Sequence, residues 1–146
     1  MKRAHLILAA GAFLCLICVA AVADALVVTD EERLEAFVDA LSGEVSPERI
    51  DDALSFAQTD QLPFTLRSGS SERTYDNRDA ELARRVRETI APFLGTEAEL
   101  VQHNIEVDGD EADVHLRVRT IRGTVSAAIQ LEKVDGRWLI AATTLR

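Results

Sequence analysis

Residues 99–146 read ELVQHNIEVDGDEADVHLRVRTIRGTVSAAIQLEKVDGRWLIAATTLR, and this stretch decides the fold. Apolar and polar residues alternate through it with a period of two, the pattern of half-buried strands. Three dipeptides interrupt the alternation: Asp108-Gly109, Arg122-Gly123 and Asp135-Gly136. Asp-Gly is a strong signal for a two-residue hairpin turn and Arg-Gly is a weaker one. The stretch therefore predicts four antiparallel strands joined by hairpins.

The three turns can be checked against one another, because each turn determines which residues lie opposite. Centring the first turn on its dipeptide places His103 opposite Val114, and centring the third places Leu131 opposite Ile140. All three turns then bring apolar residues to one shared face, and a slip of one residue would break that agreement. We expect helices to cover this face and solvent to meet the other. The predicted covered face comprises Val101, His103, Ile105, Val107, Val114, Leu116, Val118, Val125, Ala127, Ile129, Leu131, Trp138, Ile140 and Ala142.

Three helices are predicted ahead of these strands from their start signals and apolar spacing. Thr29 followed by Glu32 is a capping box, and Ser46-Pro47 begins a second helix with proline at its first position. Asp76 is expected to cap the third helix. Two residue pairs in that helix have the spacing of supporting ion pairs. They are Glu81–Arg85 and Arg84–Glu88.

A short strand is predicted between the second and third helices. Leu62, Phe64 and Leu66 alternate with polar or short residues, and Pro63 removes a backbone donor, which favours a place at the edge of the sheet. The polar segment 67–74 that follows is expected to be a turn or loop.

The first 25 residues predict a secretory signal peptide. Lys2 and Arg3 precede an uncharged apolar run, and small-x-small cleavage sites end at Ala23 and Ala25. The run is also close to the shortest length that spans a bilayer, so an uncleaved membrane anchor is the alternative. On either interpretation, residues 26–146 form one exported domain, which is periplasmic, secreted or held on the outer side of a membrane.

The charge and cysteine content exclude several kinds of function. The net charge is −9, and loss of Lys2 and Arg3 with residues 1–23 would leave 14 basic residues against 25 acidic ones, a net of −11. Such a domain repels phosphate backbones, so nucleic acid is not an expected partner. Both cysteines, Cys15 and Cys18, lie in the signal segment, and the domain therefore has no disulfide and no cysteine metal site.

The order of elements resembles the nuclear-transport-factor-two-like superfamily, also called the cystatin-like α+β cone. The resemblance rests on helix, helix, short strand, long helix and four antiparallel strands, with the closing hairpin VDGRWLI at 134–140, and it covers about residues 28–146. It implies an α+β fold in which three N-terminal helices pack on the concave face of a curved antiparallel sheet of four to six strands. It also implies a cavity between helices and sheet, in which the isomerases and dehydratases of the superfamily place ionisable groups.

Three side chains are candidates for contact with a ligand in such a cavity: His103, Trp138 and Tyr75. His103 is the only residue of the predicted covered face that titrates near neutral pH, so it could be a buried hydrogen-bonded residue, a ligand contact or a catalytic base. Trp138 also suits a place in the core, and Tyr75 suits a hydrophobic staple before the third helix. Because His103 and His115 fall on opposite faces, no metal site is predicted, and no motif calls for a cofactor.

The sequence therefore favours an exported, non-enzymatic domain that binds a small apolar ligand or a protein partner. One alternative is a cavity enzyme of isomerase, dehydratase or cyclase type with His103 as base, which needs a carboxylate or hydroxyl near that residue and a cavity large enough for a substrate. Another is a membrane-anchored accessory domain. Charged residues on the outer sheet face, among them Arg117, Arg119, Asp113 and Glu132, favour a monomer or a weak homodimer.

Overall fold

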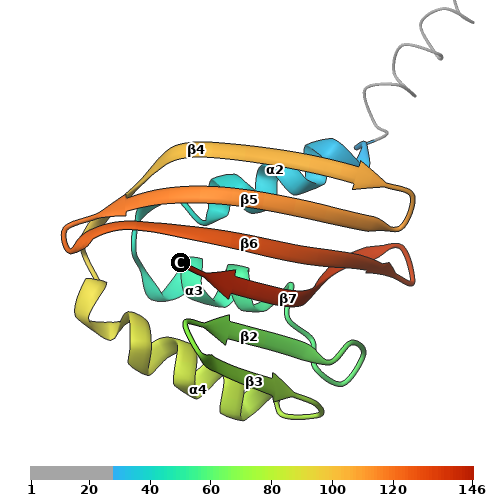
Figure 1. Cartoon of the computed structure of the whole chain (residues 1–146), viewed down its shortest axis with the longest axis horizontal. Coiled ribbons are helices and arrows are strands. Elements are labelled where there is room, and N and C mark those ends of the chain that lie inside the picture. Colours follow the sequence, from blue (N-terminus) through green and yellow to red (C-terminus); the bar gives the residue numbers. More distant parts are fainter. Residues whose placement is uncertain (1–27) are drawn as a thin grey trace, which may run out of the picture.

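Figure 1 shows the computed structural model of the chain, a curved sheet with three helices on one of its faces. The structure describes residues 28–146, so the expected signal segment at 1–25 lies outside the described residues. The elements are α2 (Asp30–Ala40), β1 (Gly43–Glu44), α3 (Pro47–Leu54), β2 (Phe64–Ser68), β3 (Ser71–Tyr75), α4 (Asp79–Ile90), a 3₁₀ turn (Ala91–Phe93), β4 (Glu97–Asp108), β5 (Glu111–Thr120), β6 (Gly123–Val134) and β7 (Arg137–Leu145).

The strands lie in the order β1-β4-β5-β6-β7-β2-β3. Neighbours are antiparallel except β2 and β7, which run parallel. Helix α4 lies along the β2–β3 edge, while α2 and α3 lie behind the long strands (Figure 1). This is the predicted α+β arrangement of three helices on a curved sheet. The sheet has seven strands rather than four to six, because β1 and β3 were not predicted.

Two of the three predicted helix starts are confirmed. Thr29 and Glu32 form the reciprocal capping box of α2, and Ser46 accepts a hydrogen bond from Arg49 N with Pro47 in the first turn of α3. The prediction of Asp76 as a cap is wrong, because α4 begins at Asp79. Asn77 adopts a left-handed conformation (φ 51°), which separates Asp76 from the helix.

The start of α4 is capped from a distant segment by Thr59, which is only 1% exposed. Arg78 N donates to Thr59 Oγ1 at 2.7 Å, and the Thr59 amide and hydroxyl both donate to Asp79 Oδ1 at 2.7 Å. Asn77 N also donates to Thr59 O at 3.0 Å. The loop after α3 thus takes the place of a local cap and holds α4 against the sheet.

The hairpin registers differ from the prediction without changing the faces. Asp108 pairs with Glu111 and Thr120 with Gly123, so the first two loops are 109–110 and 121–122 rather than the predicted dipeptides. His103 therefore lies opposite Leu116, two residues from the expected Val114. A shift of two residues keeps each side chain on its face. Asp135 and Gly136 do form the third turn, both with positive φ, as an Asp-Gly turn requires.

Two irregularities in the ladders move individual residues off the predicted face. The register shifts between Leu100 and Gln102, which leaves Val101 unpaired and 42% exposed while Leu100 packs on the core. A second shift at Gln130/Leu131 places Thr143, rather than Ala142, opposite Ile129. Extra residues of this kind bend a strand and increase its twist. They therefore curve the sheet around the helices, and single-residue alternation cannot reveal them.

Besides His103, whose side chain is 37% exposed, three other residues depart from the predicted distribution between the two faces. Val107 and Val125 lie toward strand ends and are 41% and 43% exposed instead of covered. Leu139, assigned to the wet face, is 1% exposed. The segment after α3 runs beside this part of β7, where Ile140 N donates to Phe56 O at 2.7 Å.

The region predicted as an edge strand followed by a loop is a hairpin. Ser68 pairs with Ser71, so segment 67–74 belongs mostly to β2 and β3, and the turn is confined to Gly69 and Ser70. β2 lies between β7 and β3 and is not an edge. Pro63 precedes the first paired residue, so its missing donor costs the ladder nothing. Within residues 28–146, no helix is both long and apolar enough to cross a membrane.

The long-range cap predicts a specific loss of stability. Thr59→Val keeps the shape of the side chain, but Arg78 N loses its buried acceptor and Asp79 keeps only the Thr59 amide of its two donors. The free energy of unfolding should therefore fall by about 2 kcal/mol in urea denaturation. Thr124→Val, an exposed threonine of β6, is the matched control and should change it by less than about 0.5 kcal/mol. Equal effects of the two substitutions would show that Thr59 does not act as a cap.

Candidate functional site

The middle of the concave face is filled by helix α2. Leu34, Phe37 and Val38 are at most 1% exposed and form one cluster with Val114 and Leu131 of the sheet. The Phe37 ring also packs against Phe56 from the segment after α3, with centroids 4.7 Å apart. A close-packed cluster of this kind leaves no room for a ligand. The larger openings on the helix side of the sheet lie at its two ends, near Trp138 and near Tyr75, and a smaller one of about 120 Å³ lies between the end of α2 and α3.

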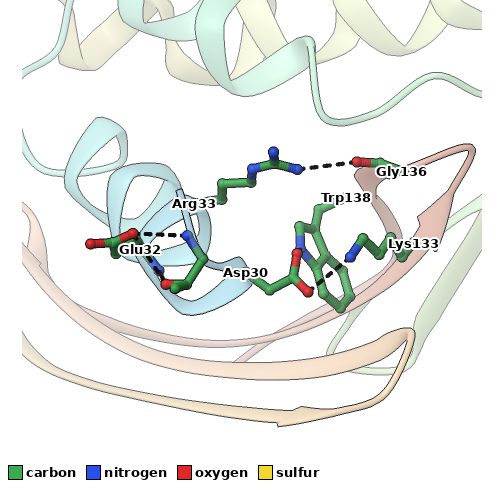
Figure 2. A network of polar contacts seen from close by, with 7 residues as sticks. Asp30, Glu32, Arg33, Lys133, Gly136 and Trp138 are labelled. Atoms are coloured by element: carbon green, nitrogen blue, oxygen red, sulfur yellow. Dashed lines mark hydrogen bonds and ion pairs between the residues drawn. The ribbon is translucent and has the colours of Figure 1, made fainter. Parts of the chain in front are cut away.

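At the first end, Asp30 of α2 binds two residues of the β6–β7 hairpin, as Figure 2 shows. Lys133 Nζ donates to Asp30 Oδ2 at 2.8 Å, and Trp138 Nε1 donates to Asp30 Oδ1 at 3.1 Å. The hydrogen bond from Lys133 is the main reason why the pKa of Asp30 is lowered; partial burial opposes it and the bond from Trp138 adds to it. Trp138 itself is 4% exposed and belongs to the core.

The remaining polar groups at this end are also paired. Arg33 donates to Gly136 O at 3.2 Å (Figure 2), and Arg137 donates to the side-chain oxygens of Gln58 and Gln61. A cleft of about 460 Å³ lies beside Trp138. Because the donors around it already bind protein acceptors, this end of the sheet serves to hold α2 against the β6–β7 hairpin.

His103 lies at the opposite side of α2, where its ring meets Glu35. The distance from His103 Nε2 to Glu35 Oε2 is 3.1 Å, with the side chains 37% and 47% exposed. The carboxylate that the catalytic alternative requires is therefore present. His103 borders a hollow of about 250 Å³ that is lined mainly by outward-facing residues of β4 to β7, such as Asn104, His115 and Ala128. The helix-covered cavity expected for a catalytic base is not where His103 lies.

Tyr75 stands at the second end, in a small core between the β2–β3 hairpin and α4. Phe64, Tyr75 and Leu82 are 6%, 1% and 2% exposed, and the two aromatic rings stack with centroids 6.1 Å apart. The Tyr75 hydroxyl is covered and has no hydrogen-bond partner among residues 28–146. Leaving such a group unpaired costs about 1–3 kcal/mol. Tyr75 therefore contributes a polar atom that the rest of the fold does not use.

A groove of about 510 Å³ lies beside this core, between the inner face of β2–β3 and α4. We call it the α4 groove; the residues important here are Leu66, Ser71, Arg73, Tyr75, Arg85 and Val86. The pairing of Leu66 with Arg73 and of Phe64 with Tyr75 explains why Arg73 and Tyr75 face α4 together. Its volume is within the range of about 300–1,000 Å³ that small-molecule sites occupy.

Two arginines border the α4 groove without an acidic partner. The side chains of Arg73 and Arg85 make no hydrogen bond or ion pair within 28–146, whereas their neighbours Arg67 and Arg84 bind Glu72 and Glu88 at 2.7 and 2.9 Å. The predicted Arg84–Glu88 pair is thus confirmed. The predicted Glu81–Arg85 pair is not formed, because Glu81 approaches Arg78 instead, at 3.7 Å. Both arginines remain free to bind an external acceptor.

The α4 groove is suited to binding and poorly suited to proton transfer. Its ionisable side chains are Arg73, Arg85 and Tyr75. Among residues 28–146, none of the carboxylates or imidazoles lines it, and these are the groups that most often abstract a proton. Within the described part of the chain, no three side chains of the kinds that hold metal ions lie together. Of the three residues named from the sequence, the structure brings only Tyr75 to this groove, and it separates His103 and Trp138 from it. Sequence reasoning missed Arg73, because segment 67–74 was expected to be a turn or loop and its residues were therefore not assigned to either face of the sheet.

No protein-family model and no curated protein matches the sequence. The fold, however, is similar to several solved structures. A protein of unknown function with a cystatin-like fold from Nostoc punctiforme has a TM-score of 0.58 at 16% identity, covering 80% of this chain and 91% of that one. An NTF2-like protein of unknown function from Pseudomonas putida has a TM-score of 0.59 at 13% identity, covering 79% and 84%.

A de novo designed protein with a curved β-sheet is equally similar, with a TM-score of 0.57 at 21% identity over 81% of this chain and 99% of the designed one. The chain thus has the NTF2-like, cystatin-like fold that its order of elements resembles. At these identities the likeness concerns the fold alone, and a fold shared with a designed protein assigns no function. The function has to be argued from the site.

The Asp30 network predicts a pH-dependent contribution to stability. Asp30→Asn should lower the thermal midpoint at pH 7, because Lys133 loses its charged partner. Since the folded-state pKa of Asp30 is lowered from 3.8, this stabilisation is present above that value and is lost as the pH falls below it. The difference from wild type should therefore shrink in thermal scans below pH 3.8. Asp60→Asn is the control, an exposed residue with no bond among those described, and should show no such trend.

The unpartnered hydroxyl predicts an unusual effect on stability. Tyr75→Phe should raise the free energy of unfolding of the ligand-free protein by about 1 kcal/mol in urea, because it removes a buried polar group that has no partner. Tyr75→Leu, which removes the ring as well, should lower it by about 3 kcal/mol. If Tyr75→Phe instead lowered the stability by more than about 1 kcal/mol, the hydroxyl would have a structural partner.

Proposed function

We propose that the protein is an exported, non-enzymatic domain that binds a small, largely apolar molecule in the α4 groove. The observation that carries the proposal is the Tyr75 hydroxyl, which is buried beside an apolar groove without a hydrogen-bond partner in the described chain. A bound molecule with one polar atom would pair with it and cover Leu66 and Val86. The N-terminal pattern of basic, apolar and small residues supports export.

The arrangement of the concave face favours this groove over the other openings. Helix α2 fills the middle of the face, and the donors beside Trp138 bind acceptors of the chain itself. The α4 groove combines the features of a small-molecule site, an apolar wall with a few polar groups. Trp138 is therefore assigned to the core, and Tyr75 is retained as the ligand contact among the residues named from the sequence.

The catalytic alternative is supported by one observation, the contact of His103 with Glu35. A carboxylate can orient an imidazole and make it a better base. The pair nevertheless lies more than a third exposed at the β4 side of the sheet, where water competes for the proton. We therefore assign to this pair the role of linking α2 to β4, and place ligand binding at the other end of the sheet.

The groove can be tested with octan-1-ol, a neutral probe with an apolar chain and one hydroxyl. Titration of ¹⁵N-labelled protein should produce saturable amide shifts at Leu66, Tyr75 and Val86, and Tyr75→Phe should weaken binding by about fivefold through loss of one hydrogen bond. The export part of the proposal is tested on the same sample. The full chain is expressed, and the intact mass of the recovered protein reports whether residues 1–23 or 1–25 were removed.

Two adjacent serines provide a matched control. Ser71 lines the groove and Ser70 lies in the turn beside it, so Ser71→Trp should abolish the shifts and Ser70→Trp should leave them unchanged. Absence of saturable shifts in the groove, or shifts confined to the cleft beside Trp138, would contradict the proposal.

A further inference from the structure

The polar groups of the α4 groove are biased toward hydrogen-bond donors. Arg73 and Arg85 offer guanidinium donors and no acceptor, and neither is engaged by another residue of the described chain. The Tyr75 hydroxyl can donate as well. A ligand that supplies only donors, or a positive charge, would find no acceptor on the arginines. The hydroxyls of Tyr75, Ser68, Ser71 and Thr89 can donate or accept, so the two guanidinium groups decide the preference, and they favour oxygen acceptors.

Charge adds to this selectivity because the protein as a whole is acidic. Against 25 acidic residues in the chain, Arg73 and Arg85 still have no carboxylate within ion-pair distance in residues 28–146. Arg67, on the strand that pairs with that of Arg73, and Arg84, next to Arg85, each have a carboxylate partner. A local positive site in a negative molecule attracts anions at short range, while the net charge repels anions elsewhere on the surface.

The apolar part of the groove defines the rest of the ligand. Leu66, Val86 and Leu145 border it, and Leu82 lies beneath them at 2% exposure. These side chains offer contact to a hydrocarbon chain and no polar partner along it. A ligand that satisfies both parts has an apolar body and an anionic oxygen head group.

We propose that the ligand of the α4 groove is an amphipathic anion, an apolar chain that ends in a carboxylate or phosphate held by Arg73 and Arg85. This rests on the proposed function, since it names the class of molecule that the groove binds. The guanidinium groups can bind such a head group through two parallel hydrogen bonds each. The chain lies along Leu66 and Val86, and an oxygen of the ligand accepts from Tyr75.

The test compares probes of equal chain length in the same titration: octanoate, octyl phosphate and octan-1-ol. At low salt, octanoate or octyl phosphate should bind about tenfold more tightly than octan-1-ol, as expected for a charge-assisted hydrogen bond. Whichever anion binds more tightly identifies the head group. Raising the salt concentration to about 0.5 M should weaken the anions and leave octan-1-ol unchanged.

Arginine variants locate the effect. Arg73→Gln and Arg85→Gln should each weaken the anion by about tenfold and change octan-1-ol by less than about twofold. Arg67→Gln and Arg84→Gln are the matched controls, since Arg67 lies on the strand paired with that of Arg73, Arg84 is next to Arg85, and each has its own carboxylate partner. Because all four arginines are exposed, the variants should retain the amide spectrum of the folded protein.

The outcomes separate the two proposals. If octan-1-ol binds in the groove and neither anion binds more tightly, or if Arg73→Gln and Arg85→Gln weaken all probes equally, the anionic ligand is excluded and the small-molecule site stands. If none of the three probes binds in the groove, both proposals fail.

Discussion

The structure depends on one constraint: the registers of the four long strands β4 to β7 must place the apolar residues of all four on the same face of the sheet. Val114, Leu116, Ile129 and Leu131 are the centre of that face and are at most 6% exposed. A sheet with one such face is not stable in water until something covers it. Helix α2 covers the middle with Leu34, Phe37 and Val38, and the segment after α3 adds Phe56. The remaining elements are placed by the space that α2 leaves, and α4 takes the β2–β3 edge.

Patterns of period two and of helical spacing were sufficient to predict the fold class. They failed for individual residues whose placement depends on an extra residue in a strand or on a contact with a distant segment. In the first two hairpins, each residue pairs with a partner two positions away from the one expected for a turn centred on the dipeptide. Alternation cannot detect such a shift, because it keeps every side chain on the same face. Val101 left the covered face because of a bulge, and Leu139 was buried by a segment that no local pattern connects to it. Asp76 was a reasonable cap from local sequence, but Thr59, about 20 residues away, provides the hydrogen bond. Each failure concerns tertiary context rather than propensity.

The candidate site was less predictable than the fold for a related reason. Tyr75 was named from the sequence as a candidate ligand contact or a hydrophobic staple. The property that makes it informative, a buried hydroxyl without a partner in the described chain, exists only after packing. Arg73 was hidden in a segment that looked like a polar loop, and Arg85 was assigned to a helix pair with Glu81. Helix spacing permits that pair, but Glu81 at i,i+3 approaches Arg78 instead. Spacing alone cannot decide between two neighbours that compete for one carboxylate.

The two ends of the concave face show that, in this protein, whether a polar side chain already has a hydrogen-bond partner is a better guide to function than its residue type. Trp138, Lys133 and Arg33 are residues often found in binding sites, yet each already donates to a protein acceptor, and a ligand would have to break those bonds to gain its own. At the α4 end, Tyr75, Arg73 and Arg85 offer donors that no described residue accepts. A ligand there gains hydrogen bonds without displacing any from the protein, so its binding is not offset by a loss within the fold. The two ends therefore differ in whether their side-chain donors already have acceptors within the protein. This difference favours the α4 groove as the binding site.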